Sequence, residues 1–276
     1  MKVCLTGAGG MLGHAIRNVF TGLELVSFTH AQLNVTKLDD TIKAIREAKP
    51  DFLIHAGAFT NVDLCESELE RAYLVNGIGT RNVVMACEET GCPVLYISSD
   101  YVFDGTKDSP YNEWDRTNPI NVYGLSKLMG ERFVSSLTNR FYIVRTSWLY
   151  GPGGKNFVDT IARLLIEKEG LQVVCDQIGS PTYTFDLAEK IRELLGRGYG
   201  TYHITNAGSC SWHEFAMSIA AHKGITKPIT PVTTEEFSRP AKRPPYSVLG
   251  STFLGLEGIA TPRHWQEALR DHLAVH

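Results

Sequence analysis

Short apolar runs alternate with amphipathic stretches through the first half of the chain. The apolar runs, each of a length typical of buried parallel strands, span residues 2–6, 23–28, 51–56, 93–99 and 141–146. Between them, hydrophobic residues recur at helical spacing, as over residues 14–20. This alternation predicts an α/β fold with a doubly wound parallel sheet. Its ligand is expected beyond the carboxyl ends of the strands, where Gly7, Ala56 and Ser99 fall.

The second half is less regular but contains the same two patterns. Over the whole chain, further helices are predicted at residues 38–49, 61–89, 156–169, 184–195 and 262–273, and further strands at residues 171–174 and 202–206. Ser211, followed three residues later by Glu214, predicts a capping box at the start of another helix. The mixture predicts a smaller mixed α/β region beside the main sheet.

Three glycines, Gly7, Gly10 and Gly13, follow the first strand and lead into the first helix. In such a pattern the first glycine makes the tight turn, the second admits the pyrophosphate of a dinucleotide, and the third lets the helix pack on the strand. The helix N-terminus then offers amide donors to the phosphates. An ordinary glycine-rich loop is the alternative. The position directly after a strand favours a dinucleotide site in a Rossmann-type fold.

The second strand leaves the choice between NADH and NADPH open. A NAD-selective site usually places an acidic residue at the end of this strand, where it binds the ribose 2′-hydroxyl. Here the strand ends in Phe28, Thr29 and His30, with neither an acid nor an arginine nearby. We therefore expect NADPH or NADH as the cofactor. Asn34 is interpreted either as a cap of the next helix or as a contact to the adenine.

Tyr123 and Lys127 are four residues apart, which on a helix places both side chains on one face. An ammonium group stabilises a neighbouring phenolate, so the pair predicts a tyrosine with a lowered pKa that can donate a proton. Ser99, at the end of a buried strand, adds a hydroxyl that could polarise the same substrate oxygen. A solvated helix face is the alternative, because two common residues at this spacing form a weak motif.

Composition narrows the class of protein. The 276 residues carry a formal net charge of −3, with 43% hydrophobic and 21% charged residues, which predicts a globular protein and gives no reason to expect nucleic-acid binding. No apolar run approaches the roughly 18 residues of a membrane span, and the N-terminus does not resemble a signal peptide. Six dispersed cysteines without a C-x-x-C pair predict reduced thiols in a cytoplasmic protein.

Four longer motifs carry a family resemblance. They are Ser-Asp-Tyr-Val-Phe-Asp-Gly at 99–105, Arg-Thr-Ser-Trp-Leu-Tyr-Gly at 145–151, Gln-x-Gly-x-Pro-Thr at 177–182 and Arg-Pro-x-x-Ser at 243–247. With the glycine pattern and Tyr-x-x-x-Lys, the chain resembles the extended short-chain dehydrogenase/reductases nearly from end to end, and most closely the dTDP-4-dehydrorhamnose reductases. The resemblance implies that NAD(P)H would transfer hydride to C4 of dTDP-4-keto-L-rhamnose, giving dTDP-L-rhamnose.

The resemblance also implies a role for each catalytic residue. Tyr123 would donate the proton to the C4 oxygen, and Lys127 would lower the pKa of Tyr123 and bind the nicotinamide ribose. Ser99, usually threonine in the family, would hydrogen-bond the keto oxygen, and Asn76 would support the proton relay. Some family members bridge subunits through a metal bound by a glutamate early in the first helix. Ala15 stands at that position here, so no metal site is predicted.

The implied cofactor and substrate residues come from several separate segments. The cofactor residues are Gly7, Gly10, Met11, Leu12, Gly13, Asn34, Val35, Ala56, Gly57, Ala58, Asn76, Tyr123 and Lys127. The substrate residues are Ser99, Asp100, Tyr101, Val102, Phe103, Trp148, Gln177 and Arg243. Arg243, in a proline-rich stretch, suits an anion such as a diphosphate; a surface loop is the alternative.

These assignments divide the chain into an NAD(P)-binding Rossmann-type domain at residues 1–147 and a mainly substrate-binding domain at residues 148–276. Residues 184–206 are expected to return to the first domain. We expect a monomer or homodimer whose partner is a dTDP-sugar, and which binds neither nucleic acid nor membrane.

Two alternatives stay open. One is another nucleotide-sugar reductase, an epimerase or a dehydratase on the same fold. A dehydratase would carry an Asp-Glu pair after the active-site hydroxyl residue, whereas this chain has Asp100 and Tyr101 there. The other is a non-catalytic NADP-binding protein similar to the regulatory subunit of methionine adenosyltransferase.

Overall fold

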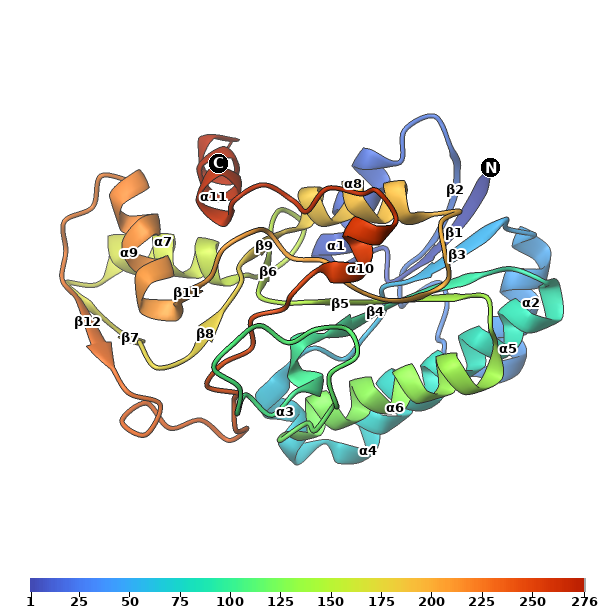
Figure 1. Cartoon of the computed structure of the whole chain (residues 1–276), viewed down its shortest axis with the longest axis horizontal. Helices are drawn as coiled ribbons and strands as arrows, with labels where there is room; N and C mark the ends of the chain where they lie inside the picture. Colours follow the sequence, from blue (N-terminus) through green and yellow to red (C-terminus); the bar gives the residue numbers. More distant parts are fainter. Residues whose placement is uncertain (276) are drawn as a thin grey trace.

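A six-stranded sheet, in which every neighbouring pair of strands is parallel, forms the centre of the larger lobe (Figure 1). The computed structural model describes residues 1–275. The strands are β1 (Lys2–Thr6), β2 (Glu24–Phe28), β3 (Phe52–His55), β4 (Val94–Ser99), β5 (Phe141–Thr146) and β10 (Gly200–His203). Their order is β2-β1-β3-β4-β5-β10, so the winding reverses between β1 and β3. The predicted doubly wound parallel sheet is confirmed.

Helices cover both faces of this sheet, because the strands of a parallel sheet bury side chains on both sides. One layer holds α1 (Met11–Val19), α8 (Thr184–Leu194) and α10 (Thr252–Leu256), and the other holds α2 (Leu38–Ala48), α5 (Thr80–Thr90) and α6 (Val122–Leu137) (Figure 1). Ile191 shares a core with Leu5 on one face of the sheet, and Val84 shares a core with Leu53 on the other. Helix α8 and strand β10 thus bring the segment 184–203 onto the larger lobe.

The single helix predicted over residues 61–89 is wrong, because this stretch forms four consecutive segments. They are α3 (Val62–Ser67), α4 (Leu69–Ala72), the π-helical segment η1 (Tyr73–Gly79) and α5. Glu68 leaves helical geometry, with φ −115° and ψ 51°, and ends α3. The π-helical turn includes Asn76, whose side chain bonds to the backbone of Phe59. Apolar spacing alone could not reveal these interruptions, since it continues through them.

The smaller lobe, at the left of Figure 1, combines short strand pairs with three helices. The strand pairs are β7 (Leu171–Val174) with β12 (Ile229–Val232), β8 (Ile178–Gly179) with β11 (Cys210–Ser211), and β6 (Leu149–Tyr150) with β9 (Thr182–Tyr183). The helices are α7 (Phe157–Glu167), α9 (Trp212–His222) and α11 (Trp265–Val275). The capping box of Ser211 and Glu214 at the start of α9 is confirmed.

Two predicted boundaries are wrong. The strand placed at residues 202–206 is β10, which ends at His203, because the chain then leaves the sheet and the side chain of Asn206 bonds to Asp186 and to the backbone of Tyr183. The last helix begins at Trp265 rather than at Pro262, since the amide of Trp265 still bonds outside the helix.

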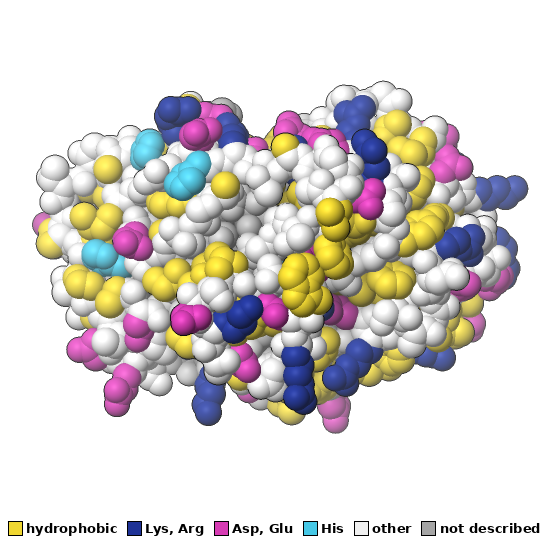
Figure 2. All heavy atoms as spheres, in the orientation of Figure 1, with side chains coloured by type: hydrophobic (Ala, Val, Ile, Leu, Met, Phe, Trp, Pro, Cys, Tyr) yellow, Lys and Arg dark blue, Asp and Glu magenta, His cyan; other side chains and the backbone are white. Residues whose placement is uncertain are grey.

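The surface shows acidic and basic side chains interspersed over the face drawn in Figure 2. None of the helices within residues 1–275 has the length and apolar character needed to cross a membrane. All six cysteines are free thiols, as predicted, and five of them are buried.

Candidate active site

The glycine turn lies at the switch point of the sheet, between the ends of β1 and β3. Gly7 has a φ of 81°, in the left-handed region that favours glycine. A Cβ atom at this position would come within 2.4 Å of the amide nitrogen of Gly57. The structure therefore brings the turn directly against the Ala56–Ala58 loop, although the two segments are far apart in the sequence.

Helix α1 presents an uncapped N-terminus beside this turn. Its N-cap residue, Gly10, has no side chain to bond the first amides, and the first turn holds no acidic residue. Free amides and the positive end of the helix dipole favour an anion there. Leu12 is 6% exposed and packs in the core, so we expect it and Met11 to contact a ligand through their backbone amides. These features fit the diphosphate of a dinucleotide.

Asn34 does not cap the next helix, so that interpretation is wrong. Its Oδ1 accepts hydrogen bonds from the backbone nitrogen of Thr36 at 3.1 Å and from the hydroxyl of Thr36 at 2.8 Å. The N-cap of α2 is Lys37, which makes no side-chain cap. Asn34 instead folds its own loop, as asparagine often does in turns. The carbonyl of Val35 accepts a bond from Asn82 at 3.0 Å. Contacts of Asn34 and Val35 with a cofactor stay predictions.

Ser99, Asp100 and Tyr123 lie together at the end of β4. The Ser99 hydroxyl donates to Asp100 Oδ1 over 2.9 Å, and Ser99 is close enough to Tyr123 to act on the pKa of its phenol. Ser99 accepts the amide of Tyr101 at 3.2 Å and so caps the short 3₁₀ helix η2 (Asp100–Val102). Asn121 caps α6 by accepting the amide of Gly124, which places Tyr123 in the first turn.

Asp100 is a buried carboxyl with one oxygen left over. It is 2% exposed, and its Oδ2 accepts no hydrogen bond from any residue of the described chain. Burial raises the pKa of Asp100 to about 6, although the nearby hydroxyls of Ser247 and Ser99 act in the opposite direction. Ser247 was not predicted as a site residue, although it ends the Arg-Pro-x-x-Ser motif. An unpaired buried oxygen beside Tyr123 is a place where a substrate donor can bind.

Tyr123 keeps its proton more firmly than the sequence predicts. Burial raises the pKa of its phenol well above the ordinary value, and the nearby Ser99 hydroxyl opposes this only in part. The ring of Tyr101 packs edge-on against it, with ring centres 5.8 Å apart. The predicted lowering of the Tyr123 pKa is therefore wrong for this state of the protein, because desolvation of the phenolate outweighs the attractions around it.

Lys127 is held one turn further along α6, where it is 2% exposed. Its ammonium donates to the carbonyl oxygen of Ile97 over 2.7 Å and lies 4.2 Å above the centre of the Tyr96 ring. Burial lowers the pKa of Lys127 to about 7, whereas the negative charge of Glu131 acts to raise it. Lys127 is thus a weak acid near neutral pH rather than a fixed cation.

A buried ion pair behind the site locks α6 to strands β4 and β5. Glu131 accepts a bond from the Ser98 hydroxyl at 2.5 Å, and Arg145 donates to both its oxygens at 2.9 Å and 2.7 Å. Both charged side chains are 7% exposed or less. Paired, charge-assisted bonds of this kind fix geometry as well as charge. Glu131 was not predicted as a site residue, although its position four residues after Lys127 places it on the same helix face.

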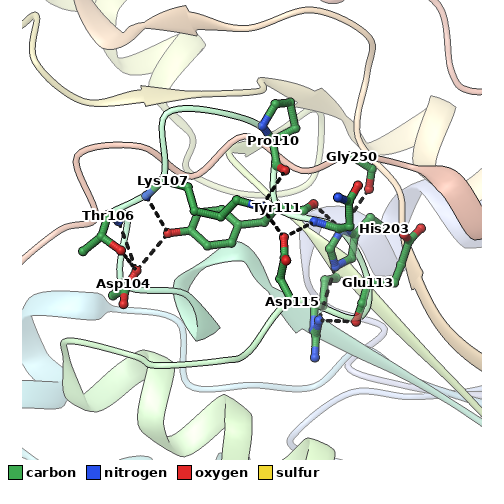
Figure 3. Close-up of polar contacts among 11 residues, drawn as sticks. Asp104, Thr106, Lys107, Pro110, Tyr111, Glu113, Asp115, His203 and Gly250 are labelled. Atoms are coloured by element: carbon green, nitrogen blue, oxygen red, sulfur yellow. Dashed lines mark hydrogen bonds and ion pairs between the residues drawn. The ribbon is translucent and has the colours of Figure 1, made fainter.

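The pair extends into a polar network around Tyr111 (Figure 3). Arg145 Nη1 lies 3.3 Å from His203 Nε2, and His203 Nδ1 lies within 3.1 Å of the carbonyl oxygens of Tyr111 and Gly250. Burial lowers the pKa of His203 to about 3, so the ring is neutral, donates from Nδ1 and accepts at Nε2. The Tyr111 hydroxyl donates to Asp104 over 2.8 Å. The network ties the loop after β4 to β5 and β10.

A cavity of about 380 Å³ lies beside this network. It is lined by Asp104, Thr106, Lys107, Tyr111, Asp115, Arg116 and Asn118. Lys107 pairs with Asp115 at 2.5 Å, and Asp104 accepts bonds from Thr106, Tyr111 and Asn118. Because Lys107, Asp115 and Asp104 are already bonded to other protein groups, the cavity is a less suitable site than the glycine turn and Tyr123.

Asn76 satisfies other protein groups rather than facing an open site. Its Nδ2 donates to the Ser126 hydroxyl at 2.9 Å and to the Phe59 carbonyl at 3.0 Å, and its Oδ1 accepts the Phe59 amide at 2.7 Å. Ser126 in turn donates to the carbonyl of Tyr123 over 2.7 Å. The side chain is fully buried. Asn76 therefore reaches α6 through Ser126, and its part in a proton relay or in cofactor binding stays a prediction.

Val102 and Phe103 do not line a pocket, which corrects the role that the resemblance implied. Both side chains have 0% exposure and belong to a core cluster with Tyr111. Phe103 stacks on the Tyr111 ring with centres 4.2 Å apart, and the Arg145 guanidinium lies 5.1 Å from the Phe103 ring centre. The cap at Ser99 turns the chain so that these two side chains point into the core. Val102 and Phe103 therefore pack in the core that underlies the site.

Arg243 and Gln177 are both anchored by hydrogen bonds. Arg243 Nη1 donates to Asp63 at 2.8 Å and to the carbonyl of Ala241 at 2.7 Å, and this arginine helps to lower the pKa of Asp63 against the effect of burial. Gln177 is 6% exposed and donates to Thr234 at 2.9 Å. Their contacts with a substrate stay predictions.

Trp148 lies between β5 and β6 and stacks on Trp212, the first residue of α9. Trp212 was not predicted as a site residue. Its only sequence signal was its place directly after the capping serine.

Ala15 is fully buried within α1. Among the described residues, no group of three or more histidine, cysteine or acidic side chains is arranged to hold a metal ion.

Comparison with known proteins gives one consistent family. The RmlD substrate binding domain family matches residues 1–276. The spore coat polysaccharide biosynthesis protein SpsK of Bacillus subtilis is 43% identical, over 99% of this chain and 96% of that protein. A dTDP-4-dehydrorhamnose reductase of Mycolicibacterium smegmatis is 36% identical, over 99% of this chain and 85% of that protein.

A crystal structure shows the same fold throughout. The dTDP-4-dehydrorhamnose reductase of Bacillus anthracis, in complex with NADP, superimposes with a TM-score of 0.97 at 42% identity and covers 100% of this chain and 99% of its own.

Proposed function

The chain belongs to the RmlD substrate binding domain family, and from that membership we propose that it is a dTDP-4-dehydrorhamnose reductase. The reaction is the NAD(P)H-dependent reduction of the C4 ketone of dTDP-4-keto-L-rhamnose to dTDP-L-rhamnose. The chain is thus an oxidoreductase that acts on a nucleotide sugar. The observation that carries the proposal is the Ser99–Tyr123 pair at the end of β4, with Lys127 one helical turn away.

The glycine turn and the start of α1 would hold the cofactor. Gly7 and Gly57 meet backbone to backbone, and the free amides after Gly10 suit its diphosphate. When bound, NAD(P)H supplies the hydride. One solved relative is a complex with NADP, and we propose NADPH or NADH as the cofactor of this chain.

Tyr123 is the proton donor in this proposal. Its raised pKa means that the phenol is fully protonated at neutral pH, so a proton is always present to transfer. As the ketone oxygen gains negative charge, the hydroxyls of Tyr123 and Ser99 donate hydrogen bonds to it. The proton of Tyr123 then passes to that oxygen. The resulting phenolate is stabilised by Lys127 in its protonated form, which a neighbouring negative charge favours.

Asp100 and Trp148 would contact the sugar, and Arg243 the diphosphate. The unpaired Oδ2 of Asp100 is suited to accept a hydrogen bond from a sugar hydroxyl, because a buried acceptor without a donor costs stability. Arg243 supplies a guanidinium suited to phosphate, already oriented by Asp63. The dTDP-sugar as partner and a monomeric or homodimeric state are proposed on the same basis.

The test is a kinetic assay with dTDP-4-keto-L-rhamnose, run separately with NADPH and NADH. The expected result is loss of the absorbance of the reduced nicotinamide that requires the sugar, with dTDP-L-rhamnose as the product. The ratio of the two rates gives the cofactor preference. If folded protein binds NADPH and yet reduces neither this sugar nor another dTDP-4-keto-6-deoxy sugar, the proposal is wrong, and a non-catalytic binding protein becomes the better account.

A further inference from the structure

Trp148 adopts a backbone conformation that its side chain disfavours. Its φ is 46°, and the only other non-glycine residue of the described chain with a positive φ is Lys49, at the end of α2. This region is unfavourable for a bulky residue, so the surrounding structure has to hold it in place.

Trp212 is the principal contact of Trp148. The two indole rings stack with centres 3.5 Å apart and planes 6° from parallel. Trp212 is itself held by Phe157 of α7, with ring centres 4.5 Å apart. Stacked aromatic pairs of this kind add to the free energy of burial. The start of α9 therefore fixes the position of a side chain that follows β5.

Gly179 leaves the space that the Trp148 ring occupies. A Cβ atom on Gly179 would lie 2.4 Å from Cε2 and 2.6 Å from Nε1 of Trp148, distances that require a rigid ring to move. Gly179 also pairs with Cys210 in the β8–β11 ladder, which places α9 next to it. The glycine of the Gln-x-Gly-x-Pro-Thr motif is thus explained by its contact with Trp148.

The stack belongs to the surface of the lobe rather than to its interior. Both indoles are only partly buried, and both pack at the edge of the core formed by residues such as Phe215 and Trp265. A tryptophan whose purpose was only to fill the core would be expected to be more deeply buried, as Trp265 is at 4% exposure.

We infer that Trp212, with Gly179 beneath, is a positioning residue that holds the Trp148 indole against the sugar of the bound dTDP-sugar. This inference rests on the proposed function for the substrate itself. Trp212 does not contact the reacting atoms in this arrangement. It acts through Trp148, and it affects how well the sugar binds rather than how fast the proton is transferred.

Three substitutions test the inference. Trp212→Ala removes the stack, Trp212→Phe retains an aromatic ring, and Gly179→Ala displaces the Trp148 ring from the opposite segment. Trp265→Phe is the matched control, since it alters an indole of the same lobe that packs on Phe215. The measurements are the exciton couplet of the stacked indoles in far-ultraviolet circular dichroism, KM and kcat for the keto sugar, the Kd for NADPH, and the Kd for dTDP-glucose as a stable sugar nucleotide.

In Trp212→Ala and Gly179→Ala the couplet is expected to disappear. KM for the sugar nucleotide and Kd for dTDP-glucose are expected to rise about threefold to tenfold, as the loss of an aromatic pair predicts, while kcat and the Kd for NADPH stay close to the wild-type values. Trp212→Phe should recover most of the binding, and Trp265→Phe should retain the couplet and the binding.

Loss of the couplet without a change in either sugar-nucleotide constant would overturn the inference. So would a rise of similar size in Trp265→Phe, which would indicate general loosening of the lobe. If the wild-type protein reduces no keto sugar, the proposed function has failed, and the Kd for dTDP-glucose still decides whether the stack positions a sugar nucleotide.

Discussion

Asp100 and Glu131 are two buried carboxyl groups, one near the start of α6 and one within it, and the protein surrounds them differently. Glu131 accepts bonds on both oxygens, two from Arg145 and one from Ser98. Asp100 has one oxygen bonded to Ser99 and another with no partner in the described chain, and its pKa is raised to about 6. The fully paired carboxylate of Glu131 fixes α6 against β4 and β5. The Asp100 carboxyl has an oxygen free to accept a hydrogen bond from a substrate, and this unpaired oxygen makes the folded protein less stable.

The residues between these two carboxyl groups carry the proposed chemistry. Tyr123 adjoins Asp100 through Ser99, and Lys127 lies on the helix that holds Glu131. We therefore expect substitution of Tyr123 to lower the reaction rate strongly, substitution of Glu131 to lower the stability of the fold, and substitution of Asp100 to raise it.

The largest effect is expected for Tyr123→Phe, which removes the proton donor and leaves the ring. We expect kcat to fall by about 10²- to 10⁴-fold, because a positioned general acid contributes that much to the rate. The Kd for NADPH, measured by fluorescence titration, should stay near the wild-type value. A kcat equal to that of the wild type would show that another group donates the proton.

Glu131→Gln should lower the free energy of unfolding by about 3–5 kcal/mol, because it leaves the Arg145 charge buried without its partner. Urea denaturation measures the change. The matched control is Glu131→Gln combined with Arg145→Met, which removes both charges and should recover much of the loss. Equal instability of the single and double variants would show that packing, rather than the unpaired charge, is responsible.

Asp100→Asn should raise the free energy of unfolding near neutral pH by on the order of 2–3 kcal/mol. The folded state raises the pKa of Asp100 from 3.8 to about 6, so the folded protein binds the proton more tightly than the unfolded chain does. The wild-type protein therefore loses stability as the pH rises from about 4 to about 6, and the variant does not. Below about pH 4 the two proteins should have the same stability. A difference that does not change with pH would contradict this origin.

Binding of NADPH should weaken about tenfold as the pH rises through 7, because Lys127, with its pKa near 7, loses its charge there. Titrations at several pH values measure this dependence. Lys127→Met should bind more weakly at low pH and show little dependence on pH. If the dependence persists in this variant, another group is responsible for it.

The smallest effect is expected for Arg163→Ala, at a surface pair that contrasts with both buried carboxyl groups. Arg163 donates to Glu167 at 2.7 Å, and the two side chains are 59% and 51% exposed. Solvent screens such a pair, so thermal unfolding should show a change within about 0.5 kcal/mol. A larger loss of unfolding free energy would mean that exposed ion pairs stabilise this protein more than solvent screening allows.

Local patterns in the sequence determined much of the fold and the cofactor side of the site. Strands of a parallel sheet are buried on both faces and therefore appear as continuous apolar runs. The covering helices are buried on one face and show apolar residues at helical spacing, so the two patterns together predict the parallel sheet. Gly7, Gly10 and Gly13 are visible for a similar reason, since they lie within one strand–turn–helix unit. The Tyr123–Lys127 spacing also needs only one helix.

The tertiary structure alone decided which distant groups meet and how deeply each is buried. It paired Glu131 with Arg145, stacked Trp148 on Trp212, and turned Phe103 into the core. It also raised the pKa of Tyr123 where the neighbouring lysine predicted a decrease. Desolvation depends on every atom packed around a group, and those atoms come from segments whose contacts are set by the whole fold rather than by spacing along the chain.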